Sequence, residues 1–202
     1  MPAKPRTPAP QKLDTRVLMR PGTQLVMAMA DFDAADGYQI RIDEVVHGFR
    51  FSHGFCDEED EDDFDAGAEL DETVEVATTA LERGDEVIFL SQGSVSVAEE
   101  TDGPYAATPP FLVSRKVLAG LKAGAAVKLT IFGETAELQP GGGETVALKV
   151  NGEERHVAAL RAKDDEQGMT LLVLDDETWP LLLSAEFQGD NYIRLVAIHA
   201  LA

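Results

Sequence analysis

The sequence predicts a mainly β protein, an antiparallel sandwich or a partly open barrel with one short helix at about residues 114–122. Short stretches of alternating apolar and polar residues recur along the chain, and this is the period of a half-buried strand. Turn-forming Gly, Asn and Asp residues separate many of these stretches at intervals of about eight to twelve residues. Apolar residues make up 44% of the 202 positions, so the chain can bury a sizeable core.

Residues 1–22 predict a flexible, basic, Pro-rich arm. They hold five basic residues against Asp14 alone, and four of the first ten positions are proline. No continuous apolar core follows the basic residues, so we expect no signal peptide. No apolar run approaches a membrane span, and the single cysteine, Cys56, cannot form an internal disulfide. These features favour a soluble, cytoplasmic protein without a membrane partner.

Residues 23–100 predict a first β module. The stretches "TQLVMAMA" (23–30) and "YQIRIDEVVHGFRFSHGF" (38–55) flank the turn-forming "DFDAADG", which predicts a hairpin. Later, "TVEVATT", "DEVIFLS" and "SVSVAEE" predict a three-strand meander with turns at "ERGD" and "QG".

Residues 101–110 form a Pro-rich connection and are the best candidate for an internal boundary. The helix expected directly after it, in "SRKVLAGLKAG", begins at a capping Ser114 and ends at Gly124. Its apolar stripe consists of Val117, Leu118 and Leu121.

Residues 111–202 predict a second module, in which that helix precedes a meander of strands. The joints "PGGG", "NG", "DDEQG", "DDET" and "QGDN" are rich in the residues that hairpins require. Asn151-Gly152 is the strongest of these signals, because it suits a type I′ turn. The pattern leaves open whether the two modules form a single domain.

The order "PFLVSRKVLAGLKAG", "KVNG", "LLVLDD" with "PLLL", and a closing "YIRLVAI" resembles the C-terminal half of uncharacterised bacterial β-rich proteins. The resemblance covers roughly residues 110–199. It implies a short helix before a meander and a partly closed β-barrel, and it implies no activity. Secreted members carry a signal peptide, which this chain lacks, so a periplasmic role is not implied.

Charge is distributed unevenly along the chain, whose formal net charge is -20. Residues 57–72, which we name the acidic segment, hold eleven acids and no base. Like charges at every relevant spacing predict a long solvated loop there, not a strand or a stable helix. The acidic excess disfavours direct binding of nucleic acid or of anionic membrane surfaces and favours a basic partner.

The acidic segment is therefore the predicted partner-binding site, since apolar residues interspersed among carboxylates can meet a basic groove. A purely solvating role for the segment stays open as the plainer interpretation. The predicted partner-binding residues are Phe55, Asp57, Glu58, Glu59, Asp60, Glu61, Asp62, Asp63, Phe64 and Asp65.

Metal and cofactor sites are not expected. His47, His53 and Cys56 have zinc-ligand chemistry, but no paired-cysteine element fixes a geometry. For calcium, a twelve-residue loop with Gly67 at its sixth position puts Phe64 and Ala66 where oxygen ligands belong.

Enzymatic chemistry also has little support. Neighbouring carboxylates would disfavour the thiolate of Cys56, which is the form that attacks. Asp175, Asp176 and Glu177 beside Trp179 could suggest a glycosidase, but such acids are more often turn formers and Trp179 a core residue.

The favoured function is a non-enzymatic binding or assembly protein that engages a basic protein partner through the acidic segment. Self-association through the basic arm is also possible, because arm and segment have opposite charges. One alternative is a nucleic-acid-mimicking inhibitor of a basic enzyme. Another is a carrier of a small apolar ligand, in a cavity lined by Phe49, Phe51, Phe89, Phe132 and Trp179.

Overall fold

A computed structural model describes residues 9–29, 38–46, 49–55, 70, 72–91, 94–96, 104–131 and 133–200. In these ranges, the helices are α1 (Thr15–Leu18), α2 (Thr78–Arg83) and α3 (Arg115–Lys122). The strands are β1 (Gln24–Met29), β2 (Tyr38–Glu44), β3 (Phe49–Phe55), β4 (Glu72–Val76), β5 (Phe89–Ser91), β6 (Ser94–Ser96), β7 (Val127–Ile131), β8 (Glu134–Val150), β9 (Glu153–Asp164), β10 (Met169–Leu174), β11 (Leu182–Phe187) and β12 (Asp190–His199).

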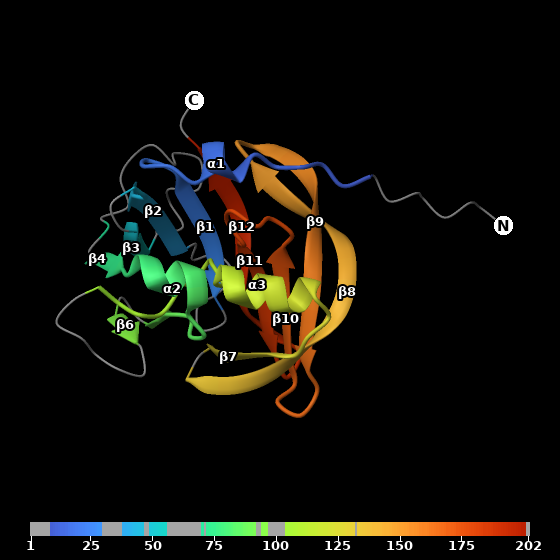
Figure 1. The fold of residues 1–202 in the computed structure, drawn as a ribbon. Helices are drawn as coiled ribbons and strands as arrows, with labels where there is room; N and C mark the ends of the chain where they lie inside the picture. Colours follow the sequence, from blue (N-terminus) through green and yellow to red (C-terminus); the bar gives the residue numbers. More distant parts are fainter. Residues whose placement is uncertain are drawn as a thin grey trace.

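Ten strands form one sheet in the order β4-β3-β2-β1-β12-β11-β10-β9-β8-β7, and part of this sheet closes into a ring (Figure 1). Strands β8 to β12 form an antiparallel meander. In a meander with an odd number of strands the first and last run in the same direction, so the closing pair must be parallel. β12 pairs with β8 in parallel, with Ala197 opposite Lys149 and Ile198 opposite Val150. The predicted mainly β, partly open barrel is confirmed.

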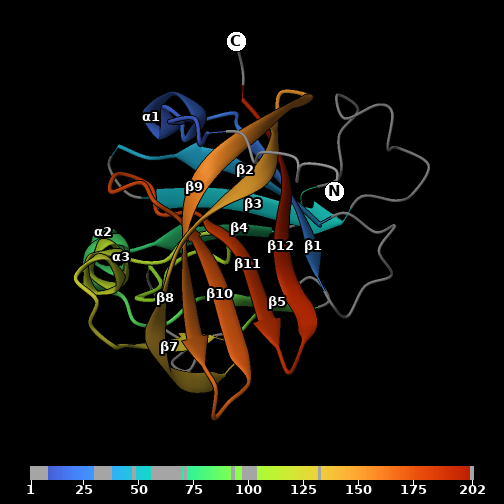
Figure 2. The same ribbon diagram turned by 90° about the vertical axis from the view of Figure 1, so that its right-hand side faces the viewer.

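The remaining strands extend the sheet beyond the ring. β1 pairs antiparallel with β12 and continues through β2 and β3 to β4, while β7 pairs with β8. Figure 2 shows β2, β3 and β4 crossing the direction of the barrel strands. The sheet therefore contains strands from both sides of the predicted boundary at 101–110.

The predicted helix is confirmed as α3. The Ser114 hydroxyl accepts a hydrogen bond from the backbone N–H of Val117 at 3.3 Å, which caps the first turn. Val117, Leu118 and Leu121 are buried, and Gly124 adopts a φ of +73° just beyond the helix. The apolar stripe thus fixes α3 against the core, next to α2 (Figure 1).

Of two glycine-containing turns predicted between strands, the one at Asn151-Gly152 is confirmed and the one at "PGGG" is wrong. Asn151 and Gly152 have φ values of 49° and 79°, as a type I′ hairpin between β8 and β9 requires. "PGGG", by contrast, is not a turn between two strands. It lies inside the 17-residue strand β8, where a register shift between Pro140 and Gly142 makes a bulge.

The N-terminal half differs from its predicted arrangement in two places. The predicted hairpin is present as the antiparallel pair β1 and β2, but its second stretch holds two strands, β2 and β3, which also pair with each other. The three-strand meander is also wrong: β4 pairs with β3, α2 follows it, and β5 pairs only with β6.

The second part of the predicted flexible arm packs on the body of the protein. Residues 15–18 form α1, and Leu18 and Met19 belong to the hydrophobic core. Residues 1–8 lie outside the described residues. The extended-arm prediction is thus wrong for residues 15–19, because burial of these two apolar side chains holds the chain down.

Aromatic rings connect strands β1 to β4, which we name the extension, to strands β7 to β12, which we name the barrel. Phe49 of β3 lies 5.9 Å from Phe111 and 5.6 Å from Trp179, measured between ring centroids, and Phe51 lies 5.6 Å from Phe111. Phe49, Phe51 and Phe111 are fully buried. Rings at such separations attract one another beyond the gain from burial, so this cluster joins the two parts of the sheet.

Candidate functional site

The two ends of the acidic segment are held side by side on neighbouring strands. β3 ends at Phe55, and β4 begins at Glu72, directly opposite His53 in the antiparallel register. The side chain of Phe55 and all of residues 57–65 lie outside the described residues, so their predicted role in binding stays a prediction. The structure describes the two places between which the segment runs, the end of β3 and the start of β4. We call these two strand ends the base of the segment.

A buried polar array of Tyr38, His53 and Glu72 lies at this base. The Tyr38 hydroxyl hydrogen-bonds to Nδ1 of His53, and Nε2 of His53 lies 3.5 Å from Oε2 of Glu72. His53 and Tyr38 are each 1% exposed, whereas the Glu72 side chain is 52% exposed. The array therefore runs from the core to the surface across β2, β3 and β4.

Burial and the Glu72 charge both act on the pKa of Tyr38. Burial of the hydroxyl, followed by the nearby Glu72 carboxylate, raises the pKa of Tyr38 well above its usual value of 10.0. Tyr38 therefore keeps its proton at neutral pH, and its hydroxyl shares one hydrogen bond with Nδ1 of His53.

Alternation along the strands explains why these side chains meet. Tyr38, Ile40 and Ile42 share one face of β2, and Phe51 and His53 share the corresponding face of β3. The sequence already showed this alternation. It did not show that Glu72, the last acid of the acidic segment, belongs to a strand and pairs with His53.

The two arginines of β2 and β3 are already paired with acids. Arg41 Nε lies 3.0 Å from Oδ1 of Asp43, and Arg50 Nη2 lies 3.6 Å from Oε2 of Glu44. Both acids belong to β2. The basic residues of β2 and β3 therefore do not offset the negative charge of the acidic segment.

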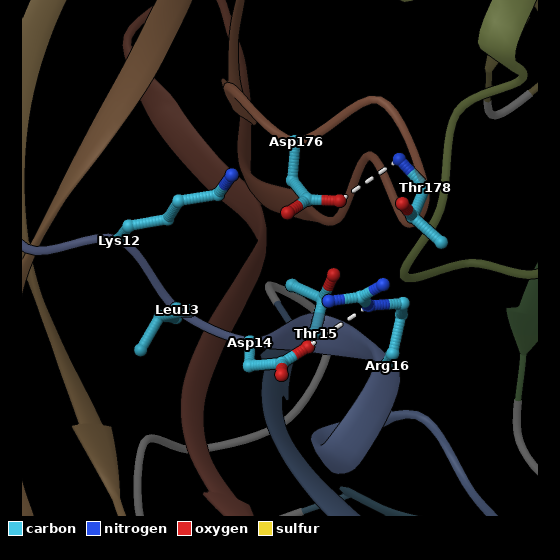
Figure 3. A pocket seen from close by; sticks show the side chains of 7 residues that line it. All are labelled: Lys12, Leu13, Asp14, Thr15, Arg16, Asp176 and Thr178. Carbon is cyan, nitrogen blue, oxygen red and sulfur yellow. Dashed lines mark hydrogen bonds and ion pairs between the residues drawn. The ribbon is translucent and has the colours of Figure 1, made fainter.

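A second candidate site is a groove between the N-terminal segment, residues 10–16, and the turn at residues 175–178. The groove encloses about 420 Å³ and continues into a smaller space of about 190 Å³ next to Ala158 and Leu174. Figure 3 shows Lys12, Asp14, Thr15 and Arg16 on one side and Asp176 and Thr178 on the other. Its charged residues are Lys12, Asp14 and Arg16, which are exposed, and Asp176, which is half-buried.

The turn side of this groove is firmly held. Oδ1 of Asp176 accepts the backbone N–H groups of Thr178 at 2.9 Å and Trp179 at 3.0 Å. From α3, Arg115 donates to the carbonyl of Thr178 at 3.0 Å. Lys122, also on α3, pairs with Asp175 at 3.0 Å and Glu177 at 2.9 Å.

These contacts give a structural role to Asp175, Asp176 and Glu177, the acids that could have suggested a glycosidase. Asp176 forms the turn, while Asp175 and Glu177 pair with Lys122, whose pKa is raised by the hydrogen bonds that it donates to Glu177 first and to Asp175 second. Trp179 is 9% exposed and belongs to the core. All four side chains thus have structural partners in the turn and the core.

The N-terminal side of the groove is held by fewer contacts. The backbone N–H of Gln11 donates to the carbonyl of His156 on β9 at 2.6 Å, and the Arg155 guanidinium reaches the Gln11 side chain at 3.5 Å. Further on, α1 and the buried Leu18 fix the chain again. Sequence reasoning missed this groove, because it is formed by residues more than 150 positions apart.

In the described ranges, no three His, Cys, Asp or Glu side chains come together in a way that could hold a metal ion. His47 and Cys56, two of the residues weighed as zinc ligands, lie outside those ranges. None of the helices in the described part of the chain has both the length and the apolarity that a membrane crossing needs.

Comparison of the chain with protein-family models, curated proteins and solved structures finds no match. The resemblance to bacterial β-rich proteins therefore stays a prediction. Any function must be argued from the sites themselves.

Proposed function

We propose that the chain is a cytoplasmic, non-enzymatic binding protein that docks a basic protein partner through the acidic segment, residues 57–72. The observation that carries this proposal is the placement of the segment between two paired strand ends, with Glu72 opposite His53. The stretch of chain that carries the eleven carboxylates thus begins and ends at two neighbouring strands of the sheet. A basic partner that approaches the end of β3 and the start of β4 is therefore attracted by many negative charges close together in the chain.

Uncompensated charge supports the proposal further. Arg41 and Arg50 already pair with acids of β2, so these two arginines do little to neutralise the acidic segment. Such a field raises the rate of encounter with a cation and is screened beyond about 8 Å at physiological salt. Binding is therefore fast, modest in affinity and strongly dependent on ionic strength.

The packing of the core does not favour the carrier alternative. Of the aromatics expected to line a cavity, Phe49 and Phe51 contact each other with centroids 6.4 Å apart, and Trp179 packs on Phe49. Rings that fill the space between them leave no room for a ligand. The side chain of Phe89 and all of Phe132 lie outside the described residues.

The test is to neutralise the segment without shortening it. In the segment variant, the seven acids at positions 57–63 become Asn or Gln, while Glu72 and its contact with His53 are kept. In the control variant, seven exposed acids elsewhere are neutralised in the same way, so both proteins carry the same net charge. The control positions are Glu75, Asp85, Glu134, Glu137, Asp165, Glu166 and Asp190.

Binding of a fluorescent Lys/Arg-rich peptide to each full-length protein is then measured by anisotropy at low and high salt. We expect the segment variant to bind more than about tenfold more weakly at low salt, since about 1.4 kcal/mol of lost attraction gives that factor. The control variant should lose less than about threefold, because its carboxylates are dispersed. Equal losses in the two variants would mean that net charge alone attracts the peptide, and the proposal would be wrong.

A further inference from the structure

The ring of strands is closed by a short contact between the ends of β8 and β12. β12 pairs with β8 at two positions, which involve Ala197 and Ile198 of β12, whereas β9 pairs with β8 along most of its length. Figure 2 shows the tip of the β8–β9 hairpin beside the end of β12. A contact of so few residues at the ends of two strands opens locally more often than the protein unfolds as a whole.

Asn151, in the hairpin turn, adds two hydrogen bonds to this contact. Its backbone N–H donates to the carbonyl of Ile198 at 2.8 Å, and its side-chain Oδ1 accepts the backbone N–H of Ala200 at 2.8 Å. We name these two bonds, together with the pairing of β12 and β8, the closure. Asn151 is nevertheless exposed at the surface, as is Gly152, which follows it in the turn.

An exposed asparagine that precedes a glycine has a route to lose its side-chain amide without an enzyme. The backbone nitrogen of Gly152 gives its proton to a base in the solvent and attacks Cγ of Asn151. The bond from Cγ to the side-chain nitrogen breaks, and this nitrogen takes up a proton and leaves as ammonia. Water then opens the resulting cyclic imide at either of its carbonyls, which gives aspartate or isoaspartate.

Gly152 is well suited to this attack. It has no Cβ that would hinder its nitrogen. Within the described ranges, its backbone N–H also has no hydrogen-bond acceptor, so no bond has to break before the proton is lost.

The folded turn opposes the reaction. Asn151 has a φ of 49°, and the first central residue of a type I′ turn has a ψ of about +30°. In that conformation the nitrogen of Gly152 and the Cβ of Asn151 lie on opposite sides of the Cα–C bond, whereas ring formation needs them on the same side. Rotation about this bond disrupts the turn, and movement of the side chain breaks its bond to Ala200.

We propose that Asn151 is a site of spontaneous deamidation that the closure protects and that reacts when the closure opens. The isoaspartyl product continues the main chain through the side-chain carbons, so the backbone gains a methylene group next to Gly152. A two-residue hairpin turn has no room for this insertion, and the oxygen that held Ala200 is displaced. The reaction therefore makes a transient opening of the ring permanent. It does not depend on the acidic segment.

Peptide mapping of the full-length protein tests the proposal. Trypsin releases residues 150–155 as one peptide, in which mass spectrometry measures the conversion of Asn151. The protein is kept at mildly alkaline pH, either folded or in guanidinium chloride. We expect conversion to be at least about tenfold slower in the folded protein, because a closure that is rarely open shields the residue. Asn191 is the internal control, since the bulky Tyr192 follows it and should keep its conversion far slower in the unfolded chain.

Two substitutions of Ala200 test whether the closure controls the rate. Ala200→Pro removes the N–H that Oδ1 of Asn151 accepts, whereas Ala200→Ser keeps it. We expect conversion in folded Ala200→Pro to be about threefold to tenfold faster, as loss of one hydrogen bond favours local opening, and Ala200→Ser to react like the wild type. In guanidinium chloride all three proteins should react at the same rate. Circular dichroism and thermal unfolding of each variant establish that it is folded.

The deamidated protein tests whether the product keeps the ring open. It is isolated by anion exchange, since it carries an additional negative charge, and it is compared with Asn151→Asp, which has the same charge and a normal backbone. In hydrogen exchange of residues 195–200 it should show two populations, a faster isoaspartyl one and one that exchanges like Asn151→Asp. Equal conversion in folded and unfolded protein, equal rates in Ala200→Pro and Ala200→Ser, or the absence of the faster population would each overturn the proposal.

Discussion

The barrel of β7 to β12 and the extension of β1 to β4 are built from strands of the same period but are connected in different ways. In the barrel, residues of positive φ such as Asn151, Gly168 and Gln188 make tight turns between most successive strands. In the extension, residues 30–37, 45–48 and 56–71 separate the strands. Long connections carry function more often than tight turns do, and the proposed binding segment is one of the long connections of the extension.

The largest expected effect comes from breaking the link between the two regions. Phe49 of the extension is fully buried and contacts Phe111 and Trp179. We expect Phe49→Ala to lower the free energy of unfolding by about 3–5 kcal/mol, through lost burial and the cavity that remains. Val46→Ala, at a position 75% exposed, is the control and should change it by less than about 0.5 kcal/mol.

Denaturant unfolding followed by tryptophan fluorescence and by far-UV circular dichroism measures this effect. Trp179 reports on the barrel side of the cluster, while circular dichroism reports on every strand. Coincident transitions in Phe49→Ala would show that the two regions still unfold together. A small change in stability with separate transitions would contradict the view that this cluster joins them.

The second prediction concerns the buried array of the extension. Tyr38→Phe removes the hydroxyl that hydrogen-bonds to Nδ1 of His53 and leaves a buried ring nitrogen without that bond. We expect a loss of about 1–3 kcal/mol in the free energy of unfolding. Tyr105→Phe, at a half-buried tyrosine whose hydroxyl has no partner among the described residues, is the control and should cost much less.

The same variant has a pH signature. The pKa of Tyr38 is raised in the folded state, by burial first and the Glu72 charge second, so above pH 10 the unfolded state loses the proton before the folded state does. Stability from this group is complete below pH 10 and is lost as the pH rises further. The wild-type protein should therefore lose stability faster than Tyr38→Phe between pH 9 and pH 11, and parallel curves would contradict the assignment.

The difference between the regions also explains what the sequence could predict. Hairpin turns are local, so a turn such as Asn151-Gly152 can be predicted from a few consecutive residues. The attachment of the extension is not local, because β1 pairs with β12 across more than 160 residues. No short pattern carries that information, and the predicted hairpin of residues 23–55 became part of a ten-stranded sheet.

Helix prediction shows the same dependence on local signals. α3 was predicted because Ser114 caps it, and the structure has that bond. α1 and α2 begin after Asp14 and Ala77, neither of which makes a side-chain cap bond. Without caps, and with only four and six residues, both helices depend on tertiary contacts that the sequence does not display.

For the candidate site, composition identified the acidic segment, but only the fold identified its base. The alternation in β2 and β3 indicated buried faces, yet nothing marked Glu72 as the strand partner of His53. The groove near Lys12 could not be predicted from the sequence for a similar reason, since its two sides come from opposite ends of the chain.

The third prediction tests the tight turns that distinguish the barrel. Gly152 has a φ of 79°, and a Cβ added there would meet open space, so strain of the backbone is the only cost of a side chain. Gly152→Ala should lower the free energy of unfolding by about 1–2 kcal/mol, the cost of a left-handed alanine. Gly143→Ala, at a glycine without positive φ, is the matched control and should cost less when both are compared by urea unfolding.

The smallest expected effect is at the charged contacts that hold the turn at residues 175–178. Lys122 pairs with Asp175 and Glu177, but its side chain is 37% exposed, so solvent weakens both interactions. We expect Lys122→Ala to change the free energy of unfolding by less than about 1 kcal/mol, and less still at high salt. Lys116→Ala, on the same helix without such a pair among the described residues, is the control for loss of the side chain alone.

A loss well above 1 kcal/mol in Lys122→Ala that persists at high salt would contradict this ranking. It would mean that the charged contacts of the barrel are as important to stability as the buried array of the extension. The ranking follows from burial: Tyr38 and His53 are almost completely shielded from water, whereas the ion pairs of Lys122 compete with it. The groove beside the turn should accordingly keep its shape when Lys122 is lost, because Asp176 and the Arg115–Thr178 contact still hold the turn in place.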